Sequence, residues 1–187
     1  EQEKVKERWP AAVRFIQERG LNEFFAEQAD DVGIAVQGGS YNTVIRALQQ
    51  LGLADAYGDT RVPLYVMNVA YPLVDAELLR FSEGKRALLV VEEGQPNFVE
   101  QNVAAILRQA GSTTALHGKD LLPVAGEYTT AAVLQGLRGF LQAHGKLAAD
   151  PAPPTPARRT IPLMPEPAHP IEASTAARPP GFCTGCP

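Results

Sequence analysis

Two cysteines near the end of the chain, Cys183 and Cys186, have the side-chain type and spacing that point most directly to chemistry. A C-x-x-C pair brings two thiolates to one metal ion from a single tight turn, and Gly185 permits the bend. A four-coordinate site needs further ligands, and the sequence offers no other cysteine. Any metal held by Cys183 and Cys186 must therefore be completed by residues outside this chain. The alternative is that both are reduced thiols with a packing role.

A second candidate is the carboxylate pair Glu92 and Glu93, which directly follows the uninterrupted apolar run Ala87–Val91. Such a run is typical of a parallel strand covered on both faces, and sites on parallel sheets gather at the carboxyl ends of the strands. Paired carboxylates there can bind a metal or transfer protons. The nearest third carboxylate is Glu100. The alternative interpretation is a capped loop in which both side chains have a structural role.

A third candidate is the turn Gly38–Gly39–Ser40, which separates the apolar run Val32–Val36 from an amphipathic segment. Helix N-terminal amides after a strand can bind an anion. The turn lacks the G-x-G-x-x-G spacing and has no P-loop lysine. A tight turn in which Ser40 caps the following helix explains the residues as well. The histidines His117, His144 and His169 have no metal-ligand spacing, and we expect each of them on the surface or in a loop.

The elements that position these residues alternate between strand-like and helical patterns. Short apolar runs predict strands, and apolar positions three and four apart predict helices. Alternation of this kind predicts an α/β fold with a mostly parallel sheet flanked by helices on both faces. The expected strands are 32–36, 64–69, 87–91 and 113–117; the expected helices are 41–51, 75–81, 98–110 and 129–143.

Proline usage divides the chain into segments. Eleven of the sixteen prolines lie between Pro151 and Pro187, and each one removes a backbone donor and restricts φ. We expect residues 1–29 to be a helical lead-in and residues 30–144 to be the α/β domain. Residues 145–180 are expected to be an extended proline-rich linker, with a disordered tail as the alternative.

Charge and hydropathy exclude several classes of function. The net charge of −4 and the pI near 5.4 argue against nucleic acid as the partner, because binding phosphates requires clustered Lys and Arg. No apolar run approaches the roughly 18 residues of a membrane span. The N-terminal residues are charged and lack the pattern of a secretory signal. We therefore expect a cytoplasmic protein without a membrane partner.

Several stretches resemble a known family. The segments ALLVVEE from Ala87, FVEQNV from Phe98 and HGKDLLPVAGEYT from His117 are similar to the α-subunit of indolepyruvate ferredoxin oxidoreductases. VMNVAYPL from Val66, and the helix that follows Gly38–Ser40, resemble the same domain, whose fold in that family is that of transketolase C-terminal domains. The final RPPGFCTGCP from Arg178 resembles the start of the family's thiamine-diphosphate-binding domain. The resemblance covers residues 30–187.

The resemblance implies a segment of a thiamine-diphosphate-dependent oxidoreductase that converts arylpyruvates such as indolepyruvate, with coenzyme A, to acyl-CoA and CO2. Electrons would pass through iron–sulfur clusters to an acceptor such as ferredoxin. This chain would hold the middle domain, with residues 181–187 starting the thiamine domain. It would contact other domains and a second subunit, and be inactive alone. The resemblance implies that the full enzyme binds thiamine diphosphate and Mg²⁺, and that this chain alone binds neither.

In related enzymes the corresponding C-x-x-C supplies cluster ligands, so Cys183 and Cys186 resemble iron–sulfur ligands. The resemblance transfers no catalytic acid or base to any residue here. The alternative hypothesis is a stand-alone α/β module that binds an anionic small molecule at the Gly38–Ser40 turn.

Overall fold

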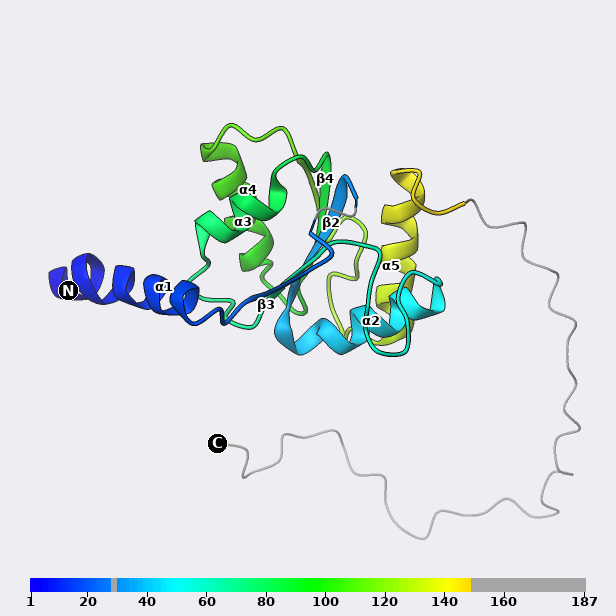
Figure 1. Cartoon of the computed structure of the whole chain (residues 1–187), viewed down its shortest axis with the longest axis horizontal. Coiled ribbons are helices and arrows are strands. Elements are labelled where there is room, and N and C mark those ends of the chain that lie inside the picture. The colour runs from blue at the N-terminus through cyan, green and yellow to red at the C-terminus, as the bar shows by residue number, and fades with distance from the viewer. Residues whose placement is uncertain (28–29, 149–187) are drawn as a thin grey trace, which may run out of the picture. The chain divides into compact units, whose positions relative to one another are not determined.

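The computed structural model describes residues 1–27 and 30–148, so Cys183, Cys186 and the proline-rich linker beyond residue 148 lie outside the described residues. The described part forms one five-stranded sheet in the order β1-β3-β2-β4-β5 (Figure 1). The strands β2 to β5 are parallel, and β1 pairs with β3 in the antiparallel direction. The strands are β1 (Glu23–Phe25), β2 (Val32–Gln37), β3 (Leu64–Met67), β4 (Ala87–Val91) and β5 (Ala115–His117).

The helices alternate with the strands along the chain. After β2 come η2 (Gly38–Ser40) and α2 (Tyr41–Gln50). The later crossovers contain α3 (Asp75–Ser82) and α4 (Phe98–Gln109), and α5 (Thr130–Ala143) follows the last strand. The mostly parallel α/β fold expected from the sequence is therefore confirmed. The expectation of a transketolase C-terminal-like fold is consistent with this arrangement.

The two faces of the sheet are covered by different helix pairs, as Figure 1 shows. On one face, side chains of α2 and α5 pack with the β2 residues Val32, Ile34 and Val36. On the other face, α3 and α4 pack with Ala35 and Tyr65. Every residue of β4 is buried, because this strand has helices on both sides. Its uninterrupted apolar sequence follows from that double coverage.

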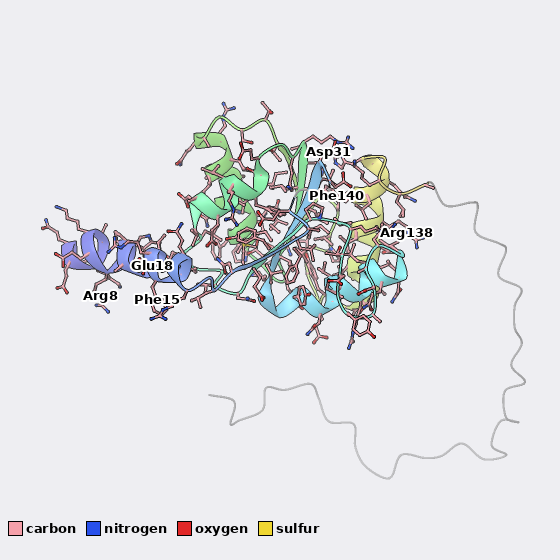
Figure 2. All side chains as sticks on the ribbon, viewed as in Figure 1. Arg8, Phe15, Glu18, Asp31, Arg138 and Phe140 are labelled. Atoms are coloured by element: carbon pink, nitrogen blue, oxygen red, sulfur yellow. The ribbon has the colours of Figure 1, made fainter. Side chains whose placement is uncertain are left out.

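The lead-in differs from the expectation. It is helical only to Glu18, through the π-helical turn η1 (Lys4–Arg8) and α1 (Trp9–Glu18), and residues 23–25 then form the edge strand β1. Figure 2 shows the side chains of Arg8, Phe15 and Glu18 along the projecting helix. Residues 23–25 form a strand because they pair with β3 at the edge of the sheet. The Phe24 ring stacks on Tyr65 of β3, with ring centroids 4.8 Å apart. Local sequence does not carry that cross-strand contact.

A buried polar group anchors the junction between α1 and β1. The amide of Asn22 donates to the Glu77 carboxylate at 2.8 Å, and its oxygen accepts the N–H of Val69 at 3.0 Å. The Tyr65 hydroxyl donates to the same carboxylate at 3.0 Å. Burial, followed by the neighbouring Glu77 charge, raises the pKa of Tyr65. The lead-in is thus hydrogen-bonded to β3 and α3.

Helix ends explain how the crossovers turn. In α2 the N–H of Gly52 donates to Gln49 and that of Leu53 donates to Leu48, which is a Schellman motif with Gly52 at φ +70°. Gly52 therefore ends the helix. Ser40 was expected to cap the start of α2, but its side chain makes no capping hydrogen bond. Instead Gly38–Ser40 forms a 3-10 turn that runs directly into the helix.

Candidate functional site

The glycine turn 38–40 and the carboxylate pair 92–93 lie at the same edge of the sheet, at the point where the strand order reverses. The chain leaves β2 toward β3 on one side and goes from β4 to β5 on the other. In parallel sheets the crevice outside the carboxyl ends of two such strands is the usual ligand position. Residues 38–40 follow β2 and residues 92–93 follow β4. The N–H of Glu93 donates to the side-chain oxygen of Gln37 at 3.3 Å, so the segments are in contact.

Glu92 is buried and acts as the cap of α4. Its two carboxylate oxygens accept the backbone N–H groups of Val99 at 2.9 Å and Glu100 at 3.0 Å. Those amides belong to the first turn of α4, where no carbonyl of the helix can reach them. A carboxylate also favours the positive end of the helix dipole. Glu92 therefore holds the start of α4 against the end of β4.

The neighbouring carboxylates have similar roles. Glu93 accepts the N–H of Tyr128 at 2.9 Å, and Glu100 accepts the N–H of Lys119 at 3.0 Å. The ammonium of Lys119 donates to the carbonyl oxygen of Glu92 at 2.5 Å and to the Tyr128 hydroxyl at 2.7 Å. We refer to Glu92, Glu93, Glu100, Lys119 and Tyr128 as the edge network. It joins β4, α4 and the loop between β5 and α5.

The edge network bears on the structural interpretation of the Glu92–Glu93 pair. Each of its three carboxylates accepts at least one backbone N–H from another segment. These hydrogen bonds hold loops in place and account for the position of each carboxylate. The geometry therefore agrees with the capped-loop interpretation.

The glycine turn is explained by close packing at its first residue. A Cβ on Gly38 would lie 2.6 Å from Oδ1 of Asn68 and 3.2 Å from its Cα, so a larger residue does not fit there. A Cβ on Gly39 would meet nothing within 4 Å. Ser40 is buried. The requirement for glycine at position 38 comes from the approach of β2 to β3, without any ligand.

A pocket of about 550 Å³ opens at the same carboxyl edge. It lies between the lead-in helix, the loop after β3 and α4. The rings of Trp9 and Tyr71 meet edge-on in its wall, with centroids 5.0 Å apart, and Phe98 lines it as well. Gln37 and Glu92 supply polar lining. Asp75, Asn102 and Gln109 line it too, so the pocket combines aromatic walls with polar groups.

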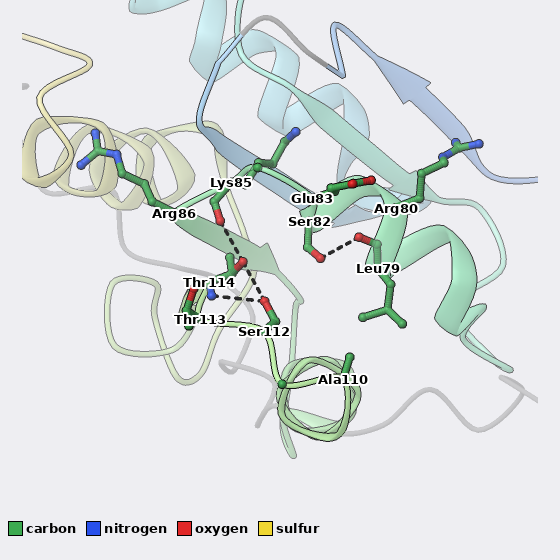
Figure 3. Close-up of a pocket in the computed structure, with 12 residues that line it drawn as sticks. Leu79, Arg80, Ser82, Glu83, Lys85, Arg86, Ala110, Ser112, Thr113 and Thr114 are labelled. Atoms are coloured by element: carbon green, nitrogen blue, oxygen red, sulfur yellow. Dashed lines mark hydrogen bonds between the residues drawn. The ribbon is translucent and has the colours of Figure 1, made fainter.

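A second, open hollow of about 700 Å³ lies at the opposite edge, at the amino ends of β4 and β5 (Figure 3). Figure 3 shows Ser112 donating to Thr114, and Thr114 donating to the carbonyl of Lys85. Ser82 likewise donates to the carbonyl of Leu79 at 2.8 Å. These hydroxyls stabilise the local turns, and the amino edge of such sheets is not the usual ligand position.

The structure also brings together two histidines that the sequence did not connect. His117 ends β5 and His144 is the C-cap of α5, and their Nε2 atoms lie 3.3 Å apart. Both were expected on the surface or in loops. His144 lies in the turn after α5, whereas His117 lies in a strand, and both are half-buried and packed beside Phe140. Twenty-seven residues separate them, so no local spacing signals the pair.

Metal and membrane features can be stated only for the described part of the chain. Across residues 1–27 and 30–148, no group of three or more His, Cys, Asp or Glu side chains is arranged to hold a metal ion. No helix in those residues is both long enough and apolar enough to cross a bilayer. The predicted metal ligands Cys183 and Cys186 are beyond these ranges, so their assignment stays a prediction.

Comparisons with known proteins agree with the resemblance. No family model matches the chain. The indolepyruvate oxidoreductase subunit IorA of Methanothermobacter marburgensis is 31% identical over 173 residues, which cover 90% of this chain and 23% of the relative. IorA of Methanothermobacter thermautotrophicus is 29% identical, covering 91% and 24%. IorA of Thermococcus kodakarensis is 30% identical over 156 residues, covering 83% and 21%.

The fold and the edge network define the class of protein as a doubly covered α/β domain with loops hydrogen-bonded to one another at its carboxyl edge. The chain spans about a quarter of the length of the curated relatives it matches. Taken with the sequence matches, the chain belongs to the IorA-like family of indolepyruvate oxidoreductase subunits.

Proposed function

We propose that this chain is a structural and assembly segment of a thiamine-diphosphate-dependent oxidoreductase that acts on indolepyruvate or related arylpyruvates. The relatives are named as subunits of an indolepyruvate oxidoreductase, which supports a place in an enzyme of more than one subunit. The whole enzyme would decarboxylate the 2-oxoacid oxidatively, with coenzyme A as acyl acceptor. The products would be acyl-CoA and CO2, with the electrons passed to an acceptor such as ferredoxin.

The observation that carries the structural role is the edge network. At the switch point of the sheet, where a catalytic group would be expected, Glu92, Glu93 and Glu100 accept backbone amides of their own chain. A segment that uses its carboxylates in this way stabilises its own loops. The proton transfers of the reaction are therefore proposed to occur on other parts of the enzyme.

The described residues do not fit the thiamine cofactor. Its magnesium ion requires oxygen ligands around one point, and residues 1–27 and 30–148 contain no cluster of three acidic or histidine side chains suited to a metal. We therefore derive no step through thiamine diphosphate in this domain. Cys183 and Cys186 remain proposed iron–sulfur ligands, completed by residues outside this chain.

The test compares the 187-residue chain with the full enzyme. Each is incubated with indolepyruvate, thiamine diphosphate, Mg²⁺, coenzyme A and a dye acceptor, and dye reduction and CO2 release are measured. We expect activity from the full enzyme and none from the chain. Activity of the isolated chain would contradict the proposal, as would an inactive full enzyme under conditions in which both subunits are folded and loaded.

A second measurement addresses the alternative of an anion-binding module. The chain is titrated with inorganic phosphate and pyrophosphate by calorimetry, with Gly39→Pro as the variant that alters the turn. Because the approach of Asn68 already explains Gly38, we expect no saturable binding. Tight binding that the variant removes would favour the stand-alone module over the oxidoreductase segment.

A further inference from the structure

The His117–His144 pair has a geometry that the structural role of the domain does not require. The two Nε2 atoms are 3.3 Å apart, the ring centroids are 5.3 Å apart, and the ring planes are inclined by 66°. The two side chains come from β5 and from the end of α5, which are different elements. Both rings pack beside Phe140, which limits their movement. Two imidazole nitrogens therefore face each other at a partly exposed position.

The other nitrogen of His117 is bound by a carboxylate. Its Nδ1 lies 2.7 Å from Oδ2 of Asp120, and the second oxygen of Asp120 accepts the N–H of Gly118 at 2.6 Å. The carboxylate can only accept, so Nδ1 carries the proton and the Nε2 of neutral His117 presents a lone pair. A histidine oriented by a carboxylate in this way is the usual arrangement around protein-bound zinc.

The charges around His144 favour its neutral form. Partial burial, followed by the neighbouring His117 and Arg86, lowers the pKa of His144 below its ordinary value of 6.5. The two nearby cations are themselves paired with carboxylates. Arg86 contacts Asp31 at 2.9 Å, and Lys146 contacts Asp30 at 2.5 Å and Asp31 at 2.7 Å. When the proton of neutral His144 is on Nδ1, its Nε2 presents a second lone pair 3.3 Å from the Nε2 of His117.

We propose that Nε2 of His117 and Nε2 of His144 chelate one divalent transition-metal ion, with Zn²⁺ as the best fit. Imidazole suits zinc, and a tetrahedral ion with bonds of about 2.1 Å separates two ligand nitrogens by about 3.4 Å. The nitrogens are already near that distance. Water fills the remaining positions, since residues 1–27 and 30–148 offer no third protein ligand in a metal-binding group.

The expected consequence of metal binding is a link between β5 and α5. The edge strand β5 has only three residues, and its contact with the end of α5 joins positions 27 residues apart. An ion that binds the folded chain and not the unfolded chain stabilises the fold by an amount that grows with the logarithm of its concentration over its dissociation constant. Zinc should therefore raise the midpoint of thermal unfolding.

The experiment titrates the 187-residue chain with Zn²⁺ by calorimetry. The chain carries His169→Ala, Cys183→Ser and Cys186→Ser, because those three side chains are also able to bind zinc. We expect saturable binding of one ion per chain. Binding should be lost in His117→Ala and in His144→Ala, weakened about tenfold or more in Asp120→Asn, and unchanged in Gln135→Ala, an exposed control on α5.

A second readout does not depend on the variants folding. Nitrogen-15 spectra of the imidazoles, recorded with and without Zn²⁺, should show both Nε2 resonances shifting together while Nδ1 of His117 stays protonated. Absence of saturable binding in the triple variant would overturn the proposal. Binding that persists in both folded histidine variants, or that shifts neither Nε2 resonance, would overturn it equally.

Discussion

The Nζ of Lys119 lies 2.7 Å from the hydroxyl oxygen of Tyr128 and 4.6 Å from the centre of its ring. The same hydroxyl donates to the carbonyl of Pro123 at 2.8 Å. Lys119 and Tyr128 belong to the GK and GEYT stretches that carry the family resemblance, and Glu92 and Glu93 belong to the VVEE stretch. The stretches are therefore parts of one hydrogen-bonded network at the carboxyl edge of the sheet.

The first prediction concerns the cap supplied by Glu92. In Glu92→Gln one of the two groups facing the α4 amides becomes an NH2 donor, which cannot accept them. Loss of a buried, charge-assisted hydrogen bond of this kind costs about 2 kcal/mol in the free energy of unfolding. The measurement is urea unfolding followed by circular dichroism. Glu127→Gln, at an exposed position of the neighbouring loop, should change the free energy by less than about 0.5 kcal/mol.

If Glu92 were instead a catalytic acid or base, the pattern would differ. The Glu92→Gln variant would then keep the stability of the wild type while the full enzyme lost turnover. Equal stability of the two chains would therefore contradict the capping role.

The second prediction concerns the two adjacent glycines after β2. Gly38→Ala places a Cβ 2.6 Å from Oδ1 of Asn68 and 3.2 Å from its backbone Cα, so the two loops must separate. Overpacking of this kind costs about 2 kcal/mol. Gly39→Ala introduces a Cβ that meets nothing within 4 Å, and we expect almost no change. Chemical denaturation of both variants checks the difference, and equal effects would refute it.

The third prediction uses two glycines of the same helix, α5. A Cβ on Gly136 would lie 2.4 Å from Leu122 and 3.0 Å from the carbonyl oxygen of Leu121, whereas Gly139 has open space. Gly136→Ala should therefore lower the free energy of unfolding by about 2 kcal/mol. Gly139→Ala should raise it by about 0.5–1 kcal/mol, because alanine is the better helix former. Thermal and urea unfolding measure the change in the free energy of unfolding for both variants. A Gly136→Ala variant that is more stable than the wild type would contradict the prediction and show that α5 can move away from the loop.

The fourth prediction concerns pH. Partial burial, then His117 and Arg86, lower the pKa of His144 in the folded chain below 6.5. Between that lower pKa and 6.5 the unfolded chain binds more protons at this position than the folded chain does. The free energy of unfolding therefore contains the whole contribution of neutral His144 above pH 6.5, and this contribution declines as the pH falls below 6.5.

The measurement is the urea midpoint between pH 7.5 and 5.5, with a chelator present to exclude metal. We expect His144→Gln to show a smaller decline than the wild type over this range. His169→Gln serves as the control and should follow the wild type. A wild-type decline that the His144 variant shares in full would assign the effect to other groups.

Local sequence was sufficient to predict most of the fold. The apolar run Ala87–Val91 is a strand with the predicted bounds, and the predicted helix at 98–110 is present as α4 (Phe98–Gln109). These elements are predictable because apolar periodicity reflects which faces are buried. The edge strand β1 was not predicted, since its three residues depend on pairing with β3 and on the stacking of Phe24 against Tyr65.

The sequence by itself determined the alternation of strands and helices, the glycine that ends α2 and the family resemblance, because each of these depends on residues close together in the chain. Only the tertiary structure decided what the polar residues do. Glu92 became a helix cap because α4 starts beside the end of β4. His117 contacts His144 because α5 runs back along the sheet. Contacts between segments far apart in sequence depend on the packing of whole elements, which leaves no local pattern to read.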